Sequence, residues 1–176
     1  TATVTININD VNEAPTMIEA TREVAENSAA NTLVGAVLTA TDPDAGAVLR
    51  FAIAGGNVLD AFSIDAVTGQ LRVRTTSSLD FEVRRTFALN VTVTDQGGLQ
   101  GWATITVNLL DRNEAPVVND ITISLPENSA ADTPVGSLLV CTDQDSGQTL
   151  SFSLVGGTDQ ASFLVSALGQ VSVKAG

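Results

Sequence analysis

The chain has 176 residues, 44% of them hydrophobic, which is enough to build a core for one or two small domains. Its formal net charge of −12 argues against nucleic acid and anionic membranes as partners, because such a surface repels phosphate. The chain has no histidine and one cysteine, so oxygens are its plentiful metal ligands, and these favour calcium or magnesium over zinc, copper or iron. No apolar run reaches the roughly 18 residues of a membrane-spanning helix, so no membrane insertion is expected.

The predicted elements are all strands. Residues 3–8 alternate polar and apolar side chains, as a half-buried strand does. Further strands are expected, in chain order, at residues 33–40, 49–53, 61–64, 70–73, 89–94 and 104–107. Core positions are expected for Phe51, Phe62, Phe81 and Phe87, with Trp102 packing at a strand edge and the lone Cys141 as a small core residue.

The chain repeats itself with an offset of 101 residues. The segment Asp10-Val11-Asn12-Glu13-Ala14-Pro15 recurs as Asp111-Arg112-Asn113-Glu114-Ala115-Pro116. Three further blocks, which contain Glu26, Asp42 and Phe62, recur at the same offset. A unit of about 100 residues with about seven strands predicts an all-β fold of tandem Greek-key (immunoglobulin-like) seven-stranded β-sandwich repeats joined end to end.

The repeat predicts three parts. Residues 1–15 correspond to the last strand and linker of a preceding repeat, and residues 16–116 form a complete repeat with its linker. Residues 117–176 cover only the first strands of a following repeat. Because such a part exposes sheet edges, we expect more protein beyond it or pairing with another chain.

The acidic residues cluster at the predicted strand ends. Calcium takes six to eight oxygens from carboxylates, amides and carbonyls, and an Asp-x-Asp run beside glycine can supply several of them. One such run is more simply a solvated turn, since aspartate is an ordinary turn residue. The recurrence of the whole set in the next unit favours a calcium site.

These motifs resemble those of cadherin repeats. The resemblance lies in Ala25-Glu26-Asn27, Thr41-Asp42-Pro43-Asp44, Thr142-Asp143-Gln144-Asp145, Leu79-Asp80-Phe81-Glu82 and Val93-Thr94-Asp95-Gln96-Gly97. The two Asp-x-Asn-Glu-Ala-Pro linkers are similar to the family's Asp-x-Asn-Asp-Asn-x-Pro, although they are one residue shorter. In that family, calcium ions sit between successive repeats.

The resemblance implies two ligand sets. The set near residue 113, the lower set, comprises Glu26, Asp80, Glu82, Asp111, Asn113, Glu114, Asp143 and Asp145. The set near residue 12, the upper set, comprises Asp10, Asn12, Glu13, Asp42, Asp44 and Asp95. The upper set lacks the acids of the preceding repeat and is expected to bind incompletely. The lower set lacks only a counterpart of Asp95, so its binding is expected to be nearly complete.

The implied function is a calcium-rigidified extracellular array, acting in cell-surface adhesion or as a structural stalk, with other copies or neighbouring repeats as partners. The alternatives are a calcium-dependent carbohydrate-binding module that takes polysaccharide, or an inert spacer in a large secreted protein. An enzyme is not expected, because the chain has neither histidine nor a nucleophile or phosphate-loop motif.

Overall fold

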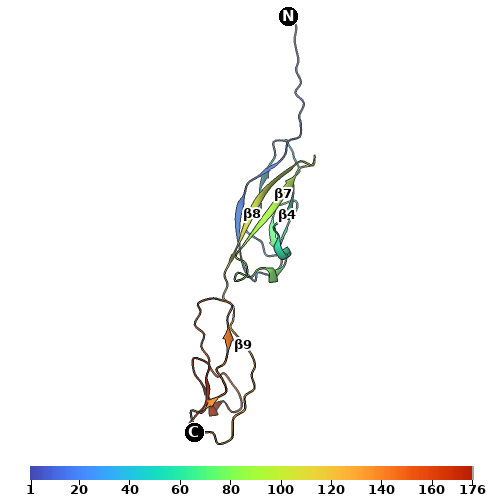
Figure 1. Ribbon diagram of the computed structural model, residues 1–176. Helices are drawn as coiled ribbons and strands as arrows, with labels where there is room; N and C mark the ends of the chain where they lie inside the picture. Colours follow the sequence, from blue (N-terminus) through green and yellow to red (C-terminus); the bar gives the residue numbers. More distant parts are fainter. Residues whose placement is uncertain (176) are drawn as a thin grey trace. The chain divides into compact units, whose positions relative to one another are not determined.

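The computed structural model describes residues 1–175 (Figure 1). The chain divides into two compact units, Thr1–Arg112 and Asn113–Gly176, and each is described by itself. Within residues 1–175 the regular elements are strands and three short 3₁₀ turns, with no α-helix, which confirms the prediction of an all-β chain.

A four-stranded sheet forms the larger layer of the first unit, and Figure 1 shows β4, β7 and β8 side by side. Its strands, in spatial order, are β2 (Ala20–Ala25), β8 (Gln100–Leu110), β7 (Thr86–Thr94) and β4 (Arg50–Gly55). β2 runs parallel to β8, whereas β8–β7 and β7–β4 are antiparallel. Because the parallel partners lie 85 residues apart in the sequence (Ala20 pairs with Ile105), this pairing ties the start of the unit to its end.

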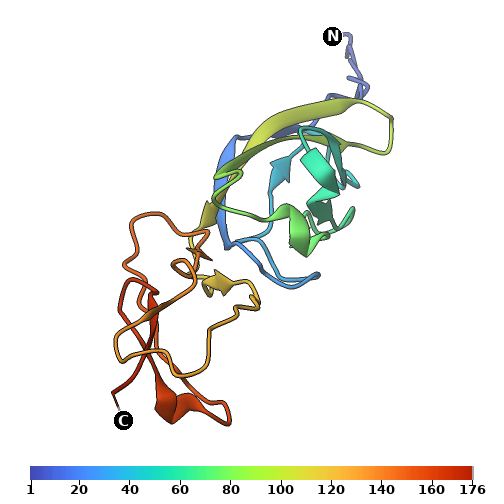
Figure 2. The ribbon, with the colours of Figure 1, turned by 60° about the horizontal axis from the view of Figure 1, so that its bottom comes forward.

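Two small sheets complete the first unit. They pair β1 (Thr16–Met17) with β3 (Ala40–Thr41), and β5 (Phe62–Ile64) with β6 (Leu71–Val73). The 3₁₀ turns η1 (Val58–Asp60) and η2 (Thr76–Ser78) flank the β5–β6 hairpin. In Figure 2 the green and yellow strands β7 and β8 lie on one side of the unit and the teal hairpin lies on the other.

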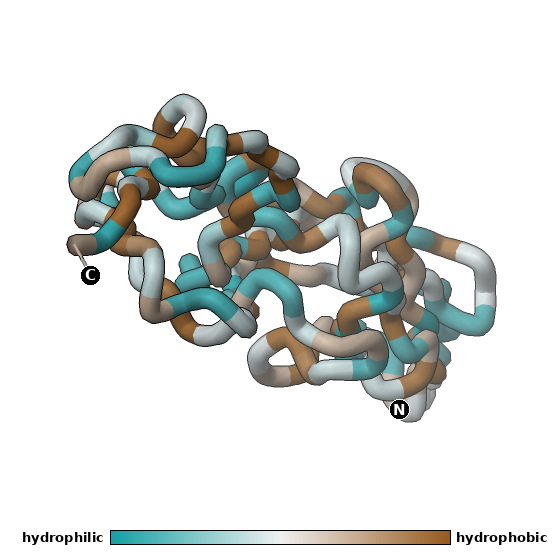
Figure 3. Tube along the Cα trace, turned by 90° about the horizontal axis from the view of Figure 1, so that it is seen from below, coloured by the Kyte–Doolittle hydropathy of each residue, from teal (hydrophilic) through white to brown (hydrophobic). Residues whose placement is uncertain are grey.

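The core lies between these two layers. Along β7 the alternate residues Phe87, Leu89, Val91 and Val93 are buried, and along β8 so are Ala103, Ile105, Val107 and Leu109. Apart from the smaller Ala103, each such side chain contributes about 1.5–3 kcal/mol when fully buried. The rings of Phe62 and Phe87 meet edge to face with centroids 5.0 Å apart, and this contact joins hairpin to sheet. Figure 3 shows apolar and polar residues interleaved along the trace.

The second unit repeats the elements of the first on a smaller scale. β9 (Val117–Val118) pairs with β11 (Cys141–Thr142), as β1 does with β3. β13 (Val171–Val173) pairs with β10 (Pro134–Val135) and with β12 (Phe163–Val165), which follows η3 (Gln160–Ser162). Cys141, expected as a small core residue, lies in β11 and is only half-buried.

Several expectations about single elements need correction. Residues 3–8 form no strand, because a strand needs a hydrogen-bonded neighbour and none of the described residues pairs with them; Ile8 is 94% exposed. Of residues 33–40, only Leu33 (an isolated bridge to Arg72) and Ala40 make strand pairings. Phe81 packs against the core but is only partly buried, and Trp102 is 74% exposed instead of packed, because it lies on the outer face of the four-stranded sheet.

Candidate metal centre

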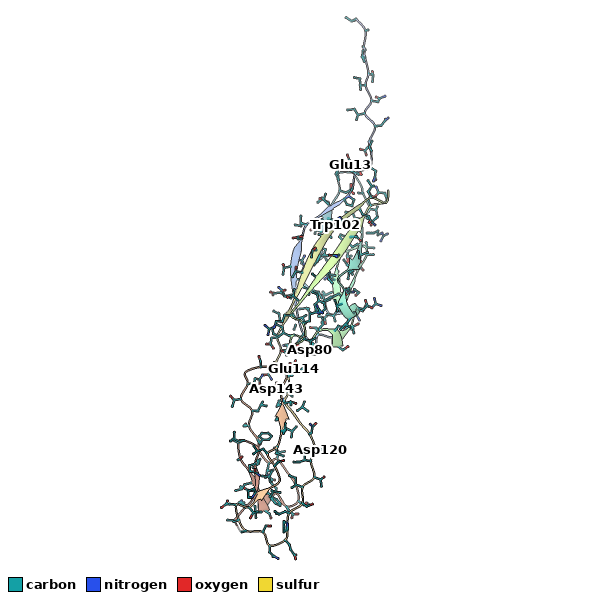
Figure 4. The ribbon with its side chains drawn as sticks, in the orientation of Figure 1. Glu13, Asp80, Trp102, Glu114, Asp120 and Asp143 are labelled. Atoms are coloured by element: carbon teal, nitrogen blue, oxygen red, sulfur yellow. The ribbon has the colours of Figure 1, made fainter. Side chains whose placement is uncertain are left out.

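The upper set lies wholly within the first unit, on three segments that meet at one end of it. Asp10, Asn12 and Glu13 precede β1, Asp42 and Asp44 follow β3, and Asp95 follows β7. Figure 4 shows Glu13 at this end of the unit and Asp80 at the opposite end. The pairing of β1 with β3 carries the first two segments to the same edge.

The turn after β3 is closed by its own side chains. Asp42 Oδ1 accepts the backbone N–H of Asp44 at 2.9 Å, which is an Asx turn. Asp44 Oδ2 in turn accepts the backbone N–H of Glu13 at 3.0 Å. One carboxylate thus orders the turn, and the other fixes the linker on it.

Asp95 anchors the third segment. Asp95 is only 6% exposed. Its Oδ1 accepts the backbone N–H of Leu99 at 2.8 Å, and its Oδ2 accepts a hydrogen bond from Asn12 Nδ2 at 2.7 Å. Burial alone would raise the pKa of Asp95, but the hydrogen bonds from Asn12 and from backbone amides outweigh it and lower that pKa. Gly97 provides the room, since a Cβ there would lie 2.7 Å from Asn12 Oδ1.

The carboxylates of the upper set crowd one another. One oxygen from each of Asp10, Glu13 and Asp44 lies within 4.8 Å of the others, and the same holds for Asp42, Asp44 and Asp95. The pKa of Glu13 is raised above its usual value. The largest cause is a hydrogen bond with Asp44, followed by burial and then by the negative charges of Asp44, Asp10 and Asp42. Asp44 belongs to both groups and therefore lies at the centre of the negative charge.

Two carboxylate oxygens at this end have no hydrogen-bond partner. Asp42 Oδ2 and Asp44 Oδ1 are buried, and nothing in the described part of the chain donates a proton to either. Leaving a charged oxygen buried and unsatisfied is costly. A cation with oxygen preference would satisfy both, so the side chains present fit calcium.

The first-unit members of the lower set gather around Glu26, which is 1% exposed. Glu26 Oε2 accepts the N–H of Phe81 at 2.7 Å, and Oε1 accepts that of Arg112 at 2.9 Å. Its carboxylate lies within 4.8 Å of that of Glu82, and Glu82 within the same distance of Asp111. Asp80 orders the loop between them, since its Oδ1 accepts the N–H of Val83 at 2.9 Å.

The second-unit members reproduce the geometry of the upper set. Asp143 Oδ1 accepts the N–H of Asp145 at 2.9 Å, and Asp145 Oδ2 accepts the N–H of Glu114 at 2.9 Å. Asn113 Nδ2 donates to the carbonyl of Glu114 at 2.9 Å, as Asn12 does to that of Glu13 at 3.4 Å. Figure 4 shows Glu114 and Asp143 together in this unit. The 101-residue repeat therefore extends to individual hydrogen bonds.

One participant was not among the predicted residues. Gln148 Nε2 donates to Asn113 Oδ1 at 2.6 Å and to Asp145 Oδ2 at 2.9 Å. Its counterpart in the first unit is Ala47, and a single glutamine carries no signal of its own in the sequence. Gln148 holds Asn113 in the second unit, whereas Asp95 holds Asn12 in the first.

The fold and these acidic strand ends define a class of protein: a β-sandwich repeat with acidic linkers. A family model described as "Cadherin domain" matches residues 20–110, which is more than half of the chain. The chain belongs to the cadherin family. The resemblance inferred from the motifs is thereby confirmed, as are the immunoglobulin-like sandwich class and the extracellular or cell-surface location.

Curated relatives agree with this assignment. The chain is 37% identical over 124 residues to human cadherin-related family member 2. The matched region spans 67% of the chain and 10% of that protein. It is 34% identical to the Drosophila melanogaster protocadherin-like wing polarity protein stan, covering 83% of the chain and 4% of that protein. It thus spans a tenth or less of the length of these relatives. Cadherins are adhesion proteins and not enzymes, which agrees with the prediction.

Solved structures give the same fold. Mouse cadherin-23 EC22-24 matches with a TM-score of 0.59 and 27% identity, covering 96% of the chain and 56% of that structure. The protocadherin gammaB7 EC3-6 cis-dimer structure matches with a TM-score of 0.64 and 26% identity, covering 98% of the chain and 47% of that structure. No helix within residues 1–175 has the length and apolar character to cross a bilayer.

Proposed function

We propose that this chain is part of an extracellular adhesion-type array in which calcium binds at the repeat junctions and stiffens them. The observation that carries the proposal is the pair of buried, unpartnered oxygens of Asp42 and Asp44 within a group of crowded carboxylates. Cadherin domains generally bind calcium, and both the motif order and the oxygen-only ligand set support it here.

The upper ligands would be Asp10, Asn12, Glu13, Asp42, Asp44 and Asp95. Bound calcium supplies positive charge that neutralises these carboxylates and satisfies their free oxygens. The chain's own contribution is to hold the oxygens in place beforehand. The Asx turn of Asp42, the hydrogen bond that Asp44 accepts from the linker N–H of Glu13, and the one that Asn12 donates to Asp95 form without metal.

The lower set is proposed from its two parts, each described within its own unit. Glu26, Asp80, Glu82 and Asp111 gather at the end of the first unit, while Asn113, Glu114, Asp143 and Asp145 repeat the arrangement of the upper set. We infer that both parts supply ligands to one junction, because the family places calcium between successive repeats. Without metal, mutual repulsion of the carboxylates should leave such a junction flexible.

Adhesion, or a stalk that supports it, is the role proposed for the whole protein. The relatives named above are cadherins and protocadherins, one of them solved as a cis-dimer, which supports contacts between copies or neighbouring repeats. The same relatives favour adhesion over polysaccharide binding and over an inert spacer.

A calcium titration tests the proposal. Thermal unfolding and small-angle scattering of the full chain would be measured at calcium concentrations from zero, in chelator, to several millimolar. The highest concentration lies above the dissociation constants of extracellular calcium modules, about 10⁻⁴–10⁻³ M. The expected result is a rise in the unfolding temperature together with a narrower distribution of distances between the units. Magnesium at equal concentration is the control, because it accepts such large oxygen cages poorly. If neither quantity changes with calcium, the proposal is wrong.

A further inference from the structure

The outer face of the four-stranded sheet carries a motif that the calcium proposal leaves unused. Asn90-Val91-Thr92 in β7 is an acceptor sequence for N-linked glycans, Asn-x-Thr with no proline between. Alternation along β7 buries Val91 and turns Asn90 to the outer face, where it is exposed. The motif is therefore accessible on an extracellular protein.

The residues around Asn90 leave space for a sugar. Its cross-strand partners are Gly55 in β4, which has no side chain, and Thr104 in β8. A Cβ added at Gly55 would lie 3.5 Å from Asn90 Nδ2, so the amide nitrogen projects over bare backbone on that side. On β7 itself the same-face neighbours are the small Ala88 and Thr92.

Trp102 supplies the second, independent observation. It is the one tryptophan of the chain, it is 74% exposed on the same outer face, and it stands directly opposite Thr92. Asn90 is therefore its diagonal neighbour, at roughly 7–8 Å between Cα atoms, within reach of a group attached to Asn90. An exposed indole offers a flat apolar surface to the C–H face of a pyranose ring. Figure 4 labels Trp102 beside the sheet.

A shallow groove continues this surface beyond Thr104. Its volume is about 290 Å³. It is lined by Glu19, Ala20, Thr21, Thr104 and Thr106, so hydroxyl groups dominate its wall. Thr104 is the cross-strand partner of Asn90 and also lines this groove. The outer sugars of a glycan attached to Asn90 could therefore contact a polar surface.

From this arrangement we propose that Asn90 is an N-glycosylation site and that its first sugar packs on Trp102. The chemistry is a glycosyl transfer from a lipid-linked diphosphate oligosaccharide, catalysed by the transferase of the secretory pathway. Asn90 Nδ2 loses one proton and bonds to the anomeric carbon, the bond from that carbon to the diphosphate oxygen breaks, and the lipid diphosphate leaves. No oxidation or reduction is involved.

The attachment is tested by secreting the full chain from eukaryotic cells and measuring its intact mass before and after digestion with an N-glycan amidase. The expected result is one glycan, released with conversion of Asn90 to aspartate. Asn90→Gln and Thr92→Ala should each abolish the glycan, whereas Asn108→Gln, an outer-face change outside any acceptor motif, should retain it. A secreted wild-type chain that is unmodified at Asn90 overturns the proposal.

The packing on Trp102 is tested by fluorescence, since all tryptophan emission comes from this residue. The glycosylated chain should emit at shorter wavelength than Asn90→Gln. After enzymatic release of the glycan, emission should match that of Asn90→Asp, which has the same side chain. In Trp102→Ala the glycan should still be attached but be released faster from the folded protein. Identical emission with and without the glycan overturns the packing, and attachment is judged by mass alone.

Discussion

Asp44 Oδ2 accepts a hydrogen bond from the backbone N–H of Glu13 at 3.0 Å. The same bond joins Asp145 to Glu114 at 2.9 Å, 101 residues further along. Each acidic linker is thus hydrogen-bonded to its own Asp-x-Asp turn before any cation binds. The residue proposed as a central calcium ligand also positions its neighbours, and suitable substitutions should separate these two roles.

Asp44→Asn keeps an oxygen that can accept from Glu13 but removes a negative charge. We expect the dissociation constant for calcium to rise about tenfold or more, equivalent to about 1.4 kcal/mol. The unfolding temperature in chelator should stay unchanged or rise slightly, because carboxylate repulsion is relieved. Calorimetric titration and thermal unfolding measure the two effects.

The matched control is Asp60→Asn. Asp60 forms an exposed ion pair with Arg74 at 3.1 Å and belongs to neither ligand set. An exposed pair of this kind contributes little, so calcium affinity and stability should both match wild type. Equal calcium affinity in Asp44→Asn and Asp60→Asn would contradict the assignment of Asp44.

Glu26→Ala should destabilise the first unit even without calcium. The substitution leaves the backbone N–H groups of Phe81 and Arg112 without their acceptor, and an unsatisfied buried group costs about 1–3 kcal/mol. Urea unfolding in chelator measures this loss. Glu23→Gln, on an exposed position of β2, should change the free energy of unfolding by no more than about 0.5 kcal/mol. If the two variants unfold alike, Glu26 has no such structural role.

Phe87→Ala should cost about 3–5 kcal/mol in the free energy of unfolding, because it removes a buried ring and its edge-to-face partner contact with Phe62. Fluorescence of Trp102 reports unfolding of the first unit alone, because the one tryptophan of the chain lies in that unit. Phe163→Ala in the second unit, where the ring is only half-buried, should leave the Trp102 transition in place. A Trp102 transition unchanged in Phe87→Ala would contradict the described core.

Asp65 should make the stability of the first unit depend on pH. Hydrogen bonds from the backbone N–H groups of Thr68 and Val67 to its carboxylate lower the pKa of Asp65 below its usual value. A lowered pKa means that the stabilisation is full above the unfolded-state value, near pH 4, and is lost as pH falls through the folded-state value.

Asp65→Asn keeps an oxygen acceptor but cannot titrate. Wild type should therefore be more stable than this variant at pH 7, and the difference should shrink as the pH is lowered below about 4. Urea unfolding at several pH values measures it. A difference that stays constant over this range would rule out the Asp65 carboxylate as the titrating group.

The second unit carries Ser166 at the position that corresponds to Asp65, and the N–H of Gln170 donates to its Oγ at 3.0 Å.

The sequence predicted strands well where alternation reflects burial. The expected strands at 61–64 and 70–73 correspond closely to β5 and β6, and those at 89–94 and 104–107 lie inside β7 and β8. The prediction for 33–40 failed because Val34 and Leu38 are buried without a regular ladder, while Leu33 and Val37 are exposed. Val34 N–H bonds to the Leu71 carbonyl, and Leu38 N–H to that of Gly69, so the backbone is satisfied by loop contacts.

The site shows a similar division. Asp-x-Asp beside glycine predicted turns whose side chains order the loop, and the hydrogen bonds of Asp42 and Asp143 have this form. The parallel pairing of β2 with β8 left no local signal, because Ala20 and Ile105 meet only in the folded chain. Gln148 was missed for a related reason: its role depends on its distance from Asn113, which the sequence does not contain.

The most direct test of the calcium account is metal density in crystals grown with calcium, identified by its anomalous scattering. We expect an ion bonded to Asp42 and Asp44 through the two oxygens that have no protein donor, at about 2.3–2.6 Å. A second ion is expected near Asn113, with ligands from Glu26 and Asp145. Crystals at several millimolar calcium that show these side chains ordered, with only water between them, would contradict it.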